Sequence, residues 1–173
     1  LEELERLAGD LRAGAGGARA LVLRSAVPEG FSAGADLREL HESLVERRRR
    51  GVPLPAQVHE LRAFVDRIHR VYDALHMVPI PTVAAVDGVA FGGGLELALT
   101  CDTLVADRSA RFAFPELRLG LVPGFGGVPR LARDVGNAVV RDLLLTGRSL
   151  RATRAHEVGR VAQVVARADA STV

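Results

Sequence analysis

The sequence contains no lysine and no tryptophan, and it has one cysteine, one methionine and one tyrosine among 173 residues. Without lysine the chain cannot form a Schiff base or complete a phosphate-binding loop that ends in Gly-Lys-Ser/Thr. A single cysteine, Cys101, excludes a disulfide within the chain and a zinc site made of cysteines. This cysteine usage is typical of a reducing compartment, so we expect a cytoplasmic protein.

Aromatic residues and long apolar runs are also scarce. Aromatics make up 4% of the chain, so the core must be built from Ala, Leu and Val, and a nucleic-acid surface of stacked aromatic rings is not expected. No apolar run approaches the ~18 residues of a transmembrane helix. The formal net charge is only +2. We therefore expect neither a membrane nor a nucleic acid as partner.

Helical and strand periodicities alternate along the chain, which predicts an α/β fold in a single domain over residues 1–173. The polar and charged residues 41–57, which include two prolines, are predicted to form an exposed, mobile loop. Strands are predicted over 18–26, over 80–88, on both sides of a turn at 107–110, and over 161–166. Helices are predicted over 1–13, 58–77, 93–100 and 136–145, near 129, and as a short segment around 151–158.

Residues 30–37 read GFSAGADL, and the first five spell G-x-S-x-G, the pattern of a serine-hydrolase nucleophile elbow. That elbow needs a strand directly before the serine, whereas Ala26–Phe31 separate Ser32 from the predicted strand. The late histidine, His156, lies in a charged helical segment, where a solvated role is the simpler interpretation. A serine-hydrolase function is therefore the weaker hypothesis.

Three glycines, Gly92–Gly94, directly precede a predicted helix. The first N–H groups of a helix lack partners within it and can bind an anion or stabilise an oxyanion, although the glycines could simply permit a tight turn. Glu96 lies in the apolar first turn of this helix, where the helix dipole also favours an acid. Glu116 lies between Pro115 and Leu117. Two poorly solvated glutamates can act as acid and base near neutral pH.

Three segments together closely resemble the enoyl-CoA hydratase/isomerase, or crotonase, superfamily: GFSAGADL, VPIPTVAAVDGVAFGGGLELALTCD and FAFPELRLGLVPGFGGVPRLARDVG. The resemblance covers about residues 19–165, and it is closest in look to the methylglutaconyl-CoA hydratase branch. It implies a spiral of ββα units with two roughly perpendicular sheets, apparently lacking part of the N-terminal β segment and the C-terminal helical region. It also implies an acyl-CoA substrate, a homotrimer or hexamer, and no metal or cofactor besides the coenzyme A of the substrate.

The same resemblance implies roles for individual residues. The N–H groups of Ala35 and Gly93 would form the oxyanion hole for the thioester carbonyl. Glu96 would activate the water, and Glu116 would hold it and protonate the α-carbon. Family isomerases usually lose the acid that matches Glu96, so the presence of both favours a hydratase over a Δ3-Δ2-enoyl-CoA isomerase. Contacts with CoA or the acyl group are implied for Ala33, Asp36, Leu37, Gly92 and Phe125.

Two departures qualify this picture. Phe125 stands where the family often has Gly or Ala, which predicts a narrowed acyl pocket. The run Arg47–Arg50 is most simply a set of solvated cations, with contacts to CoA phosphates or to RNA as alternatives. A non-catalytic or RNA-binding member of the family is therefore the hypothesis from a different functional class.

Overall fold

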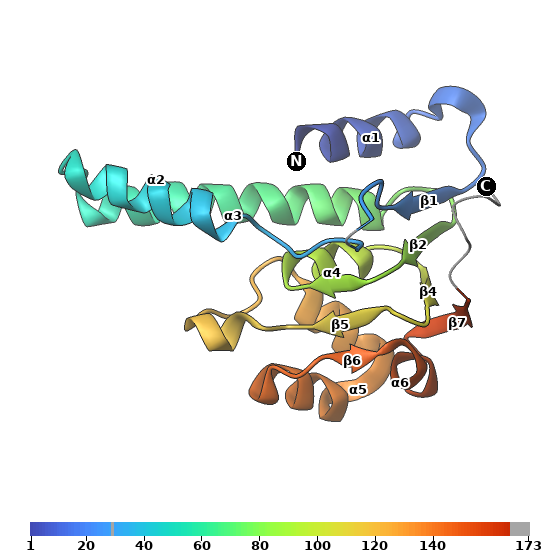
Figure 1. Cartoon of the computed structure of the whole chain (residues 1–173). Coiled ribbons are helices and arrows are strands. Elements are labelled where there is room, and N and C mark those ends of the chain that lie inside the picture. The colour runs from blue at the N-terminus through green and yellow to red at the C-terminus, as the bar shows by residue number, and fades with distance from the viewer. Residues whose placement is uncertain (29, 167–173) are drawn as a thin grey trace.

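The computed structural model describes residues 1–28 and 30–166 (Figure 1). The helices are α1 (Glu2–Arg12), α2 (Leu37–Arg49), α3 (Leu54–His76), α4 (Gly93–Ala98), α5 (Gly127–Thr146) and α6 (Ala152–Glu157), with short 3-10 helices η1 (Ala15–Gly17) and η2 (Glu116–Leu119). The strands are β1 (Leu21–Arg24), β2 (Thr82–Val86), β3 (Val89–Phe91), β4 (Thr103–Asp107), β5 (Arg111–Ala113), β6 (Leu150–Arg151) and β7 (Val161–Val165).

The strands form two sheets. The larger is fully parallel, in the order β1-β2-β4-β7, and the smaller has the order β3-β5-β6, with β3 and β5 parallel and β6 antiparallel. Ser32 pairs in parallel with Ala90 and so adds residues 30–32 beside β3. Each strand of the larger sheet from β1 to β4 is therefore followed by a segment of the smaller sheet and then by helix. This succession of ββα units confirms the predicted spiral.

Small and branched aliphatic side chains fill the space around the larger sheet, as the scarcity of aromatics predicts. The central strands carry fully buried residues such as Ala84 and Leu104, and Phe114 is the largest completely buried side chain. A second apolar cluster lies where α1 packs on α3, and it includes Ile68 and Tyr72. This second cluster brings α3 beside the segments that follow the smaller sheet.

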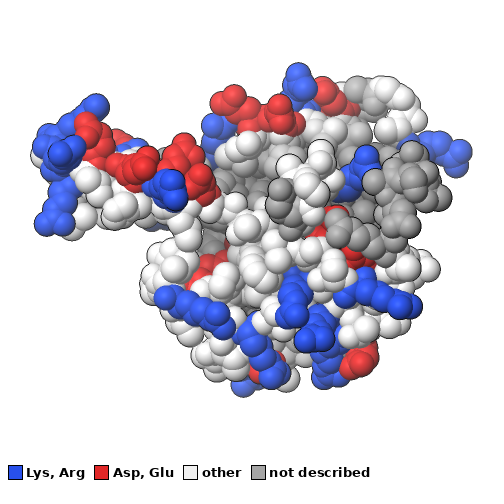
Figure 2. Space-filling model, in the orientation of Figure 1, with Lys and Arg blue, Asp and Glu red and all other residues white. Residues whose placement is uncertain are grey.

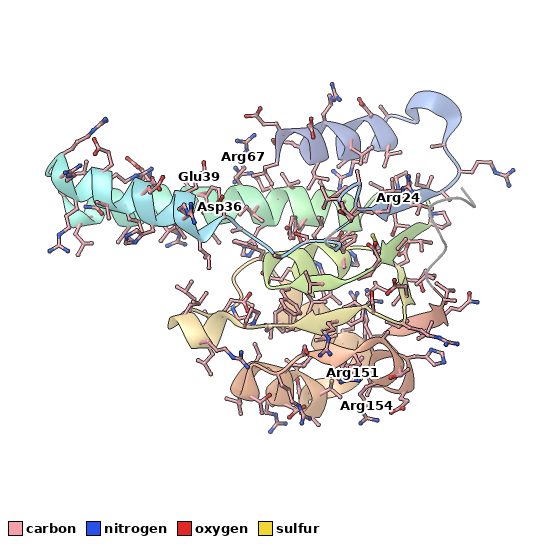
Figure 3. The ribbon with its side chains drawn as sticks, viewed as in Figure 1. Arg24, Asp36, Glu39, Arg67, Arg151 and Arg154 are labelled. Carbon is pink, nitrogen blue, oxygen red and sulfur yellow. The ribbon has the colours of Figure 1, made fainter. Side chains whose placement is uncertain are left out.

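The predicted mobile loop over 41–57 is wrong, because α2 and α3 occupy nearly all of it. Asp36 caps α2 by accepting hydrogen bonds from the N–H groups of Arg38 and Glu39 (Figure 3). Leu, Glu and Arg, which dominate α2, are all good helix formers. The prolines that suggested a loop cap and open α3, where a missing N–H costs nothing.

The basic run therefore ends a helix. Arg47, Arg48 and Arg49 form the last turn of α2, where cations interact favourably with the helix dipole. Arg47 pairs with Glu60 of α3, and Arg50 with Glu46. Figure 2 shows Arg side chains beside acidic ones on this projecting hairpin. The arrangement accounts for the run without any nucleic-acid partner.

Sequence periodicity did not predict β3, β6 or the 3-10 helices, because each is only two to four residues long. The two helices predicted near 129 and over 136–145 are both present within α5, and they meet at Gly136, whose backbone is not helical (φ 79°, ψ 163°). Among the described helices, none is long and apolar enough to cross a membrane.

Candidate active site

Three segments converge at the carboxyl ends of the parallel strands β3 and β5 and of residues 30–32, which are bridged to β3. The segment after residues 30–32 leads to Ala35, β3 leads to Gly93, and β5 leads to Glu116. Backbone hydrogen bonds bind them together, because the Phe91 N–H donates to the Ser32 carbonyl and the Gly92 N–H donates to the Ala113 carbonyl. Residues that are about eighty positions apart in the sequence thus meet at one edge of the smaller sheet.

The two predicted oxyanion donors lie on adjacent segments. A Cβ added to Gly34 would lie 3.2 Å from the Gly93 nitrogen, so the chain before Ala35 approaches the start of α4 closely. Gly93 is the first residue of α4, and the N–H groups there have no acceptor within the helix. In the described part of the chain, the N–H groups of Ala35 and Gly93 have no hydrogen-bond acceptor. Both donors are thus available to a carbonyl oxygen.

Glu96 is 1% exposed and projects from α4 toward the start of α5. Its Oε1 accepts hydrogen bonds of 2.9 Å from the N–H groups of Phe125 and Gly127. Burial raises the pKa of Glu96, while these two N–H groups and the charge of Arg130 act in the opposite direction. The pKa of Glu96 is therefore raised overall, although the two N–H groups and Arg130 offset part of the cost of burying its charged form.

Glu116 is in a different environment. Its Oε2 is buried and has no hydrogen-bond partner among the described residues, and its Oε1 lies beside Gly92, where an added Cβ would be 2.8 Å away. Burial raises the pKa of Glu116, and the negative charge of Glu96 raises it further. The carboxyl group is therefore biased toward its protonated form. Both predicted glutamates therefore have raised pKa values, but within residues 1–28 and 30–166 only Glu96 has N–H donors from other residues and a nearby cation that support its charged form.

Phe125 contacts both the segment at Gly93 and Glu96. Its ring atom Cε2 would be 3.1 Å from a Cβ added to Gly93, and its ring meets that of Tyr72 edge-on with centroids 6.2 Å apart. Tyr72 donates a 3.1 Å hydrogen bond to the Gly93 carbonyl, and burial raises the pKa of its hydroxyl. The ring of Phe125 therefore supports the oxyanion segment while its backbone holds Glu96.

Three residues at the site were missed by the sequence reasoning: His69, Tyr72 and Arg130. The first two lie on the inner face of α3, within the helix predicted over 58–77, and Arg130 lies in α5 with 8% exposure. His69 bonds the Gly124 carbonyl through Nε2. A signal was present, since a histidine, a tyrosine and an arginine on otherwise apolar helix faces are costly unless they have partners.

The remaining predicted contact residues, Ala33, Asp36 and Leu37, lie close to Ala35 in the sequence. Ala33, Asp36 and Leu37 are exposed, although the carboxylate of Asp36 is engaged in capping α2. From Ala35 a groove of about 350 Å³ runs between α2 and α3. Its lining includes apolar and charged residues, namely Asp36, Glu39, Leu40, Ser43, Leu44, Arg47, Gln57, Glu60, Leu61 and Phe64.

Ser32 has a structural position. Its Oγ accepts a 3.2 Å hydrogen bond from the Gly34 N–H, and its side chain lies against Gly94, where an added Cβ would be 2.7 Å from Oγ. We expect Ser32→Ala to lower the turnover of an enoyl-CoA thioester less than tenfold, because it removes one hydrogen bond worth about 1 kcal/mol. Steady-state rates of both proteins provide the measurement. A loss of a thousandfold or more would instead support a nucleophilic serine.

Comparison with known proteins gives the family. The model of the enoyl-CoA hydratase/isomerase family matches residues 11–172. Mitochondrial methylglutaconyl-CoA hydratase of Rattus norvegicus is 39% identical over 150 residues, covering 85% of this chain and 42% of the relative. Mitochondrial enoyl-CoA hydratase domain-containing protein 2 of Homo sapiens is 43% identical over 148 residues, covering 86% and 46%. This chain therefore spans less than half the length of these curated relatives.

The expectation of a cytoplasmic protein is wrong, because these similar relatives are mitochondrial proteins by name. The reasoning failed because one unpaired cysteine indicates a reducing environment without distinguishing one reducing compartment from another.

Solved structures agree with the sequence relatives. The enoyl-CoA hydratase of Bacillus anthracis superposes with a TM-score of 0.80 at 34% identity, covering 95% of this chain and 58% of that one. DspI of Pseudomonas aeruginosa superposes with a TM-score of 0.80 at 33% identity, covering 97% and 63%. With the sequence match over nearly its whole length and a shared fold, the chain belongs to the enoyl-CoA hydratase/isomerase family.

Proposed function

We propose that this chain carries the catalytic core of an enoyl-CoA hydratase, which adds water across the α,β double bond of an acyl-CoA thioester. The main support is the difference between the two glutamates in hydrogen-bond partners and nearby charge. Glu96 has two N–H donors and a nearby guanidinium that favour its charge, whereas the buried Oε2 of Glu116 has no partner among the described residues. One base and one acid are what hydration requires.

The proposed reaction starts with the thioester carbonyl between the N–H groups of Ala35 and Gly93. Glu96 removes a proton from water as the water oxygen forms a bond to the β-carbon, and the π electrons move toward the carbonyl oxygen. The resulting enolate is stabilised by the two N–H groups. The α-carbon then takes a proton from Glu116. Overall, water supplies OH to the β-carbon, and the proton given up by Glu116 is replaced by the one that Glu96 received.

Retention of a supported Glu96 carboxylate favours hydration over double-bond migration, which needs a single proton shuttle. The isomerase alternative therefore ranks second. RNA binding ranks lower still, because the run Arg47–Arg50 ends α2 and two of its arginines, Arg47 and Arg50, pair with glutamates. We also propose that coenzyme A, as part of the substrate, is the only cofactor, that the chain forms one domain, and that the full-length protein is a homotrimer or hexamer.

The groove between α2 and α3 is the proposed path for the acyl chain, because it starts at the oxyanion donor Ala35. It continues along α2 to Arg47, about twelve residues and therefore roughly 18 Å away. Leu40, Leu44, Leu61 and Phe64 give it an apolar lining. Among the substrates of hydratases, this geometry favours unbranched acyl chains of medium or greater length.

The proposal is tested by incubating the chain with crotonyl-CoA and with trans-2-decenoyl-CoA and following the loss of the unsaturated-thioester absorbance. 3-Methylglutaconyl-CoA, the substrate class in the name of a relative, is the third substrate. We expect hydration of the first two and the 3-hydroxyacyl-CoA as product. Migration of the double bond of a 3-enoyl-CoA without any hydration would instead identify an isomerase.

Phe125 should restrict the acyl group. Replacing it by Ala removes the ring beside Gly93 but keeps the backbone N–H that donates a hydrogen bond to Glu96. We therefore expect Phe125→Ala to raise kcat/KM for an α-methyl-branched substrate, tiglyl-CoA, relative to crotonyl-CoA by about tenfold, the scale of one or two methylene groups in a pocket. The ratio of the two kcat/KM values is the measurement. An unchanged ratio would show that the ring does not line the acyl pocket.

A further inference from the structure

Arg130 connects three elements behind the site. It is 8% exposed in the first turns of α5. Its Nη1 donates a 3.1 Å hydrogen bond to the Phe125 carbonyl, and its Nη2 pairs with Asp73 of α3. A Cβ at Gly126 (φ 86°) would lie 2.6 Å from Nη1, so the guanidinium is closely packed beneath the loop. The two nitrogens thus bridge the loop before α5 and the middle of α3.

The loop that Arg130 contacts is the one that holds Glu96. The N–H groups of Phe125 and Gly127 both donate to Oε1 of Glu96. Arg130 donates a hydrogen bond to the carbonyl of the same residue, Phe125, and His69 of α3 is hydrogen-bonded to the carbonyl of Gly124. Residues 124–127 are therefore attached to α3 at two points through carbonyl groups, while the N–H groups of Phe125 and Gly127 are directed to Glu96.

The ion pair with Asp73 does not by itself explain the burial of Arg130. The side chain of Asp73 is 69% exposed, and an ion pair with so exposed a partner contributes little to stability. A desolvated guanidinium is costly unless its donors are used. Here Arg130 donates to a carbonyl of the Glu96-binding loop. Its positive charge also lowers the pKa of Glu96, against the effect of burial.

We propose that Arg130 is a positioning residue of the site: it clamps residues 124–127 to α3 so that the Phe125 and Gly127 N–H groups stay on Glu96. A planar guanidinium is suited to this task, because one group reaches a carbonyl and a carboxylate in fixed geometry. The consequence for catalysis rests on the proposed hydratase function. The clamp itself does not, and it can be measured without turnover.

The test compares Arg130→Met and Arg130→Lys with Arg133→Met, an arginine one turn further along α5 whose side chain is 60% exposed. Two quantities are measured on the whole chain by NMR: hydrogen exchange of the Phe125 and Gly127 amides, and the titration of Glu96 with ¹³C-labelled glutamate, assigned with Glu96→Gln. We expect Arg130→Met to accelerate both amides at least tenfold and to raise the pKa of Glu96. Arg133→Met should change neither.

Arg130→Lys separates geometry from charge. Its ammonium keeps the pKa of Glu96 near that of the unmodified protein but cannot hold both partners, so exchange at Phe125 and Gly127 should still accelerate. If Arg130→Met does not fold, Arg130→Lys and Asp73→Asn decide the matter, and exchange in both equal to that of Arg133→Met would overturn the clamp. These shifts in a chain without hydratase activity would refute the proposed function and leave the clamp standing.

Discussion

Glu96→Gln is expected to lower hydration of crotonyl-CoA by a factor on the order of 10²–10⁴, the usual contribution of a general acid or base. The amide oxygen of Gln can still accept hydrogen bonds from the N–H groups of Phe125 and Gly127, so the loop keeps its conformation while the base is lost. The initial rate of absorbance loss is the measurement. Full activity in this variant would show that Glu96 is not the base.

The thermal stability of Glu96→Gln is the control for that experiment. Glu96 has a raised pKa in the folded chain, so the folded state binds this proton more tightly than the unfolded state does. The stability gained from protonation is present at low pH and is lost as pH rises through the folded pKa. A neutral Gln avoids this loss, so the melting temperature at pH 7 should not fall. A variant that is both inactive and destabilised would point to a structural cause.

The dependence of the hydration rate on pH should follow from the raised pKa values of Glu96 and Glu116. Glu96 must be ionised, so activity falls as pH drops through its raised pKa, and Glu116 must be protonated, so activity falls as pH rises through its own. The result is a bell-shaped dependence of kcat/KM. Glu116→Gln, which cannot give up a proton, should lower the rate across the whole profile.

Gly127→Ala should displace Glu96 directly. A Cβ there would lie 2.4 Å from Cγ of Glu96, at a position buried between α4 and α5. We expect the glutamate to be displaced, with a loss of about a hundredfold in rate and about 1–3 kcal/mol in the free energy of unfolding. Chemical denaturation and steady-state kinetics on the same preparation measure both quantities.

Gly124→Ala is the matched control, because a Cβ at that position meets nothing closer than 3.9 Å. It lies in the same loop and keeps the carbonyl that His69 contacts. Near-normal activity in this variant, beside a strong loss in Gly127→Ala, would assign the effect to Glu96. Equal losses in both would indicate that any substitution in the loop is harmful.

The sequence predicted the long elements because their periodicity is local, and it pointed to Glu96 because a carboxylate in an apolar first turn is conspicuous. It could not predict β3, whose three residues are defined by pairing with distant strands. The loop prediction for 41–57 failed because charged residues also occur on exposed helices such as α2, and prolines are also tolerated at the start of a helix, as in α3. Arg130 was missed because Asp73, on another helix, meets it only through tertiary packing.

The helical hairpin of α2 and α3 departs from the spiral after residues 30–32 and returns to it at β2 (Figure 1). Of the proposed reacting groups, it carries neither glutamate nor either oxyanion donor. The last turns of α3, however, carry His69, Tyr72 and Asp73, which hold the Glu96-binding loop and the Gly93 carbonyl. Insertions, deletions or exchanges confined to α2 and the first turns of α3 would therefore change the proposed acyl groove and leave these supports in place. In this architecture, natural variation or a designer can alter substrate range at one end of the hairpin separately from the chemistry at the other.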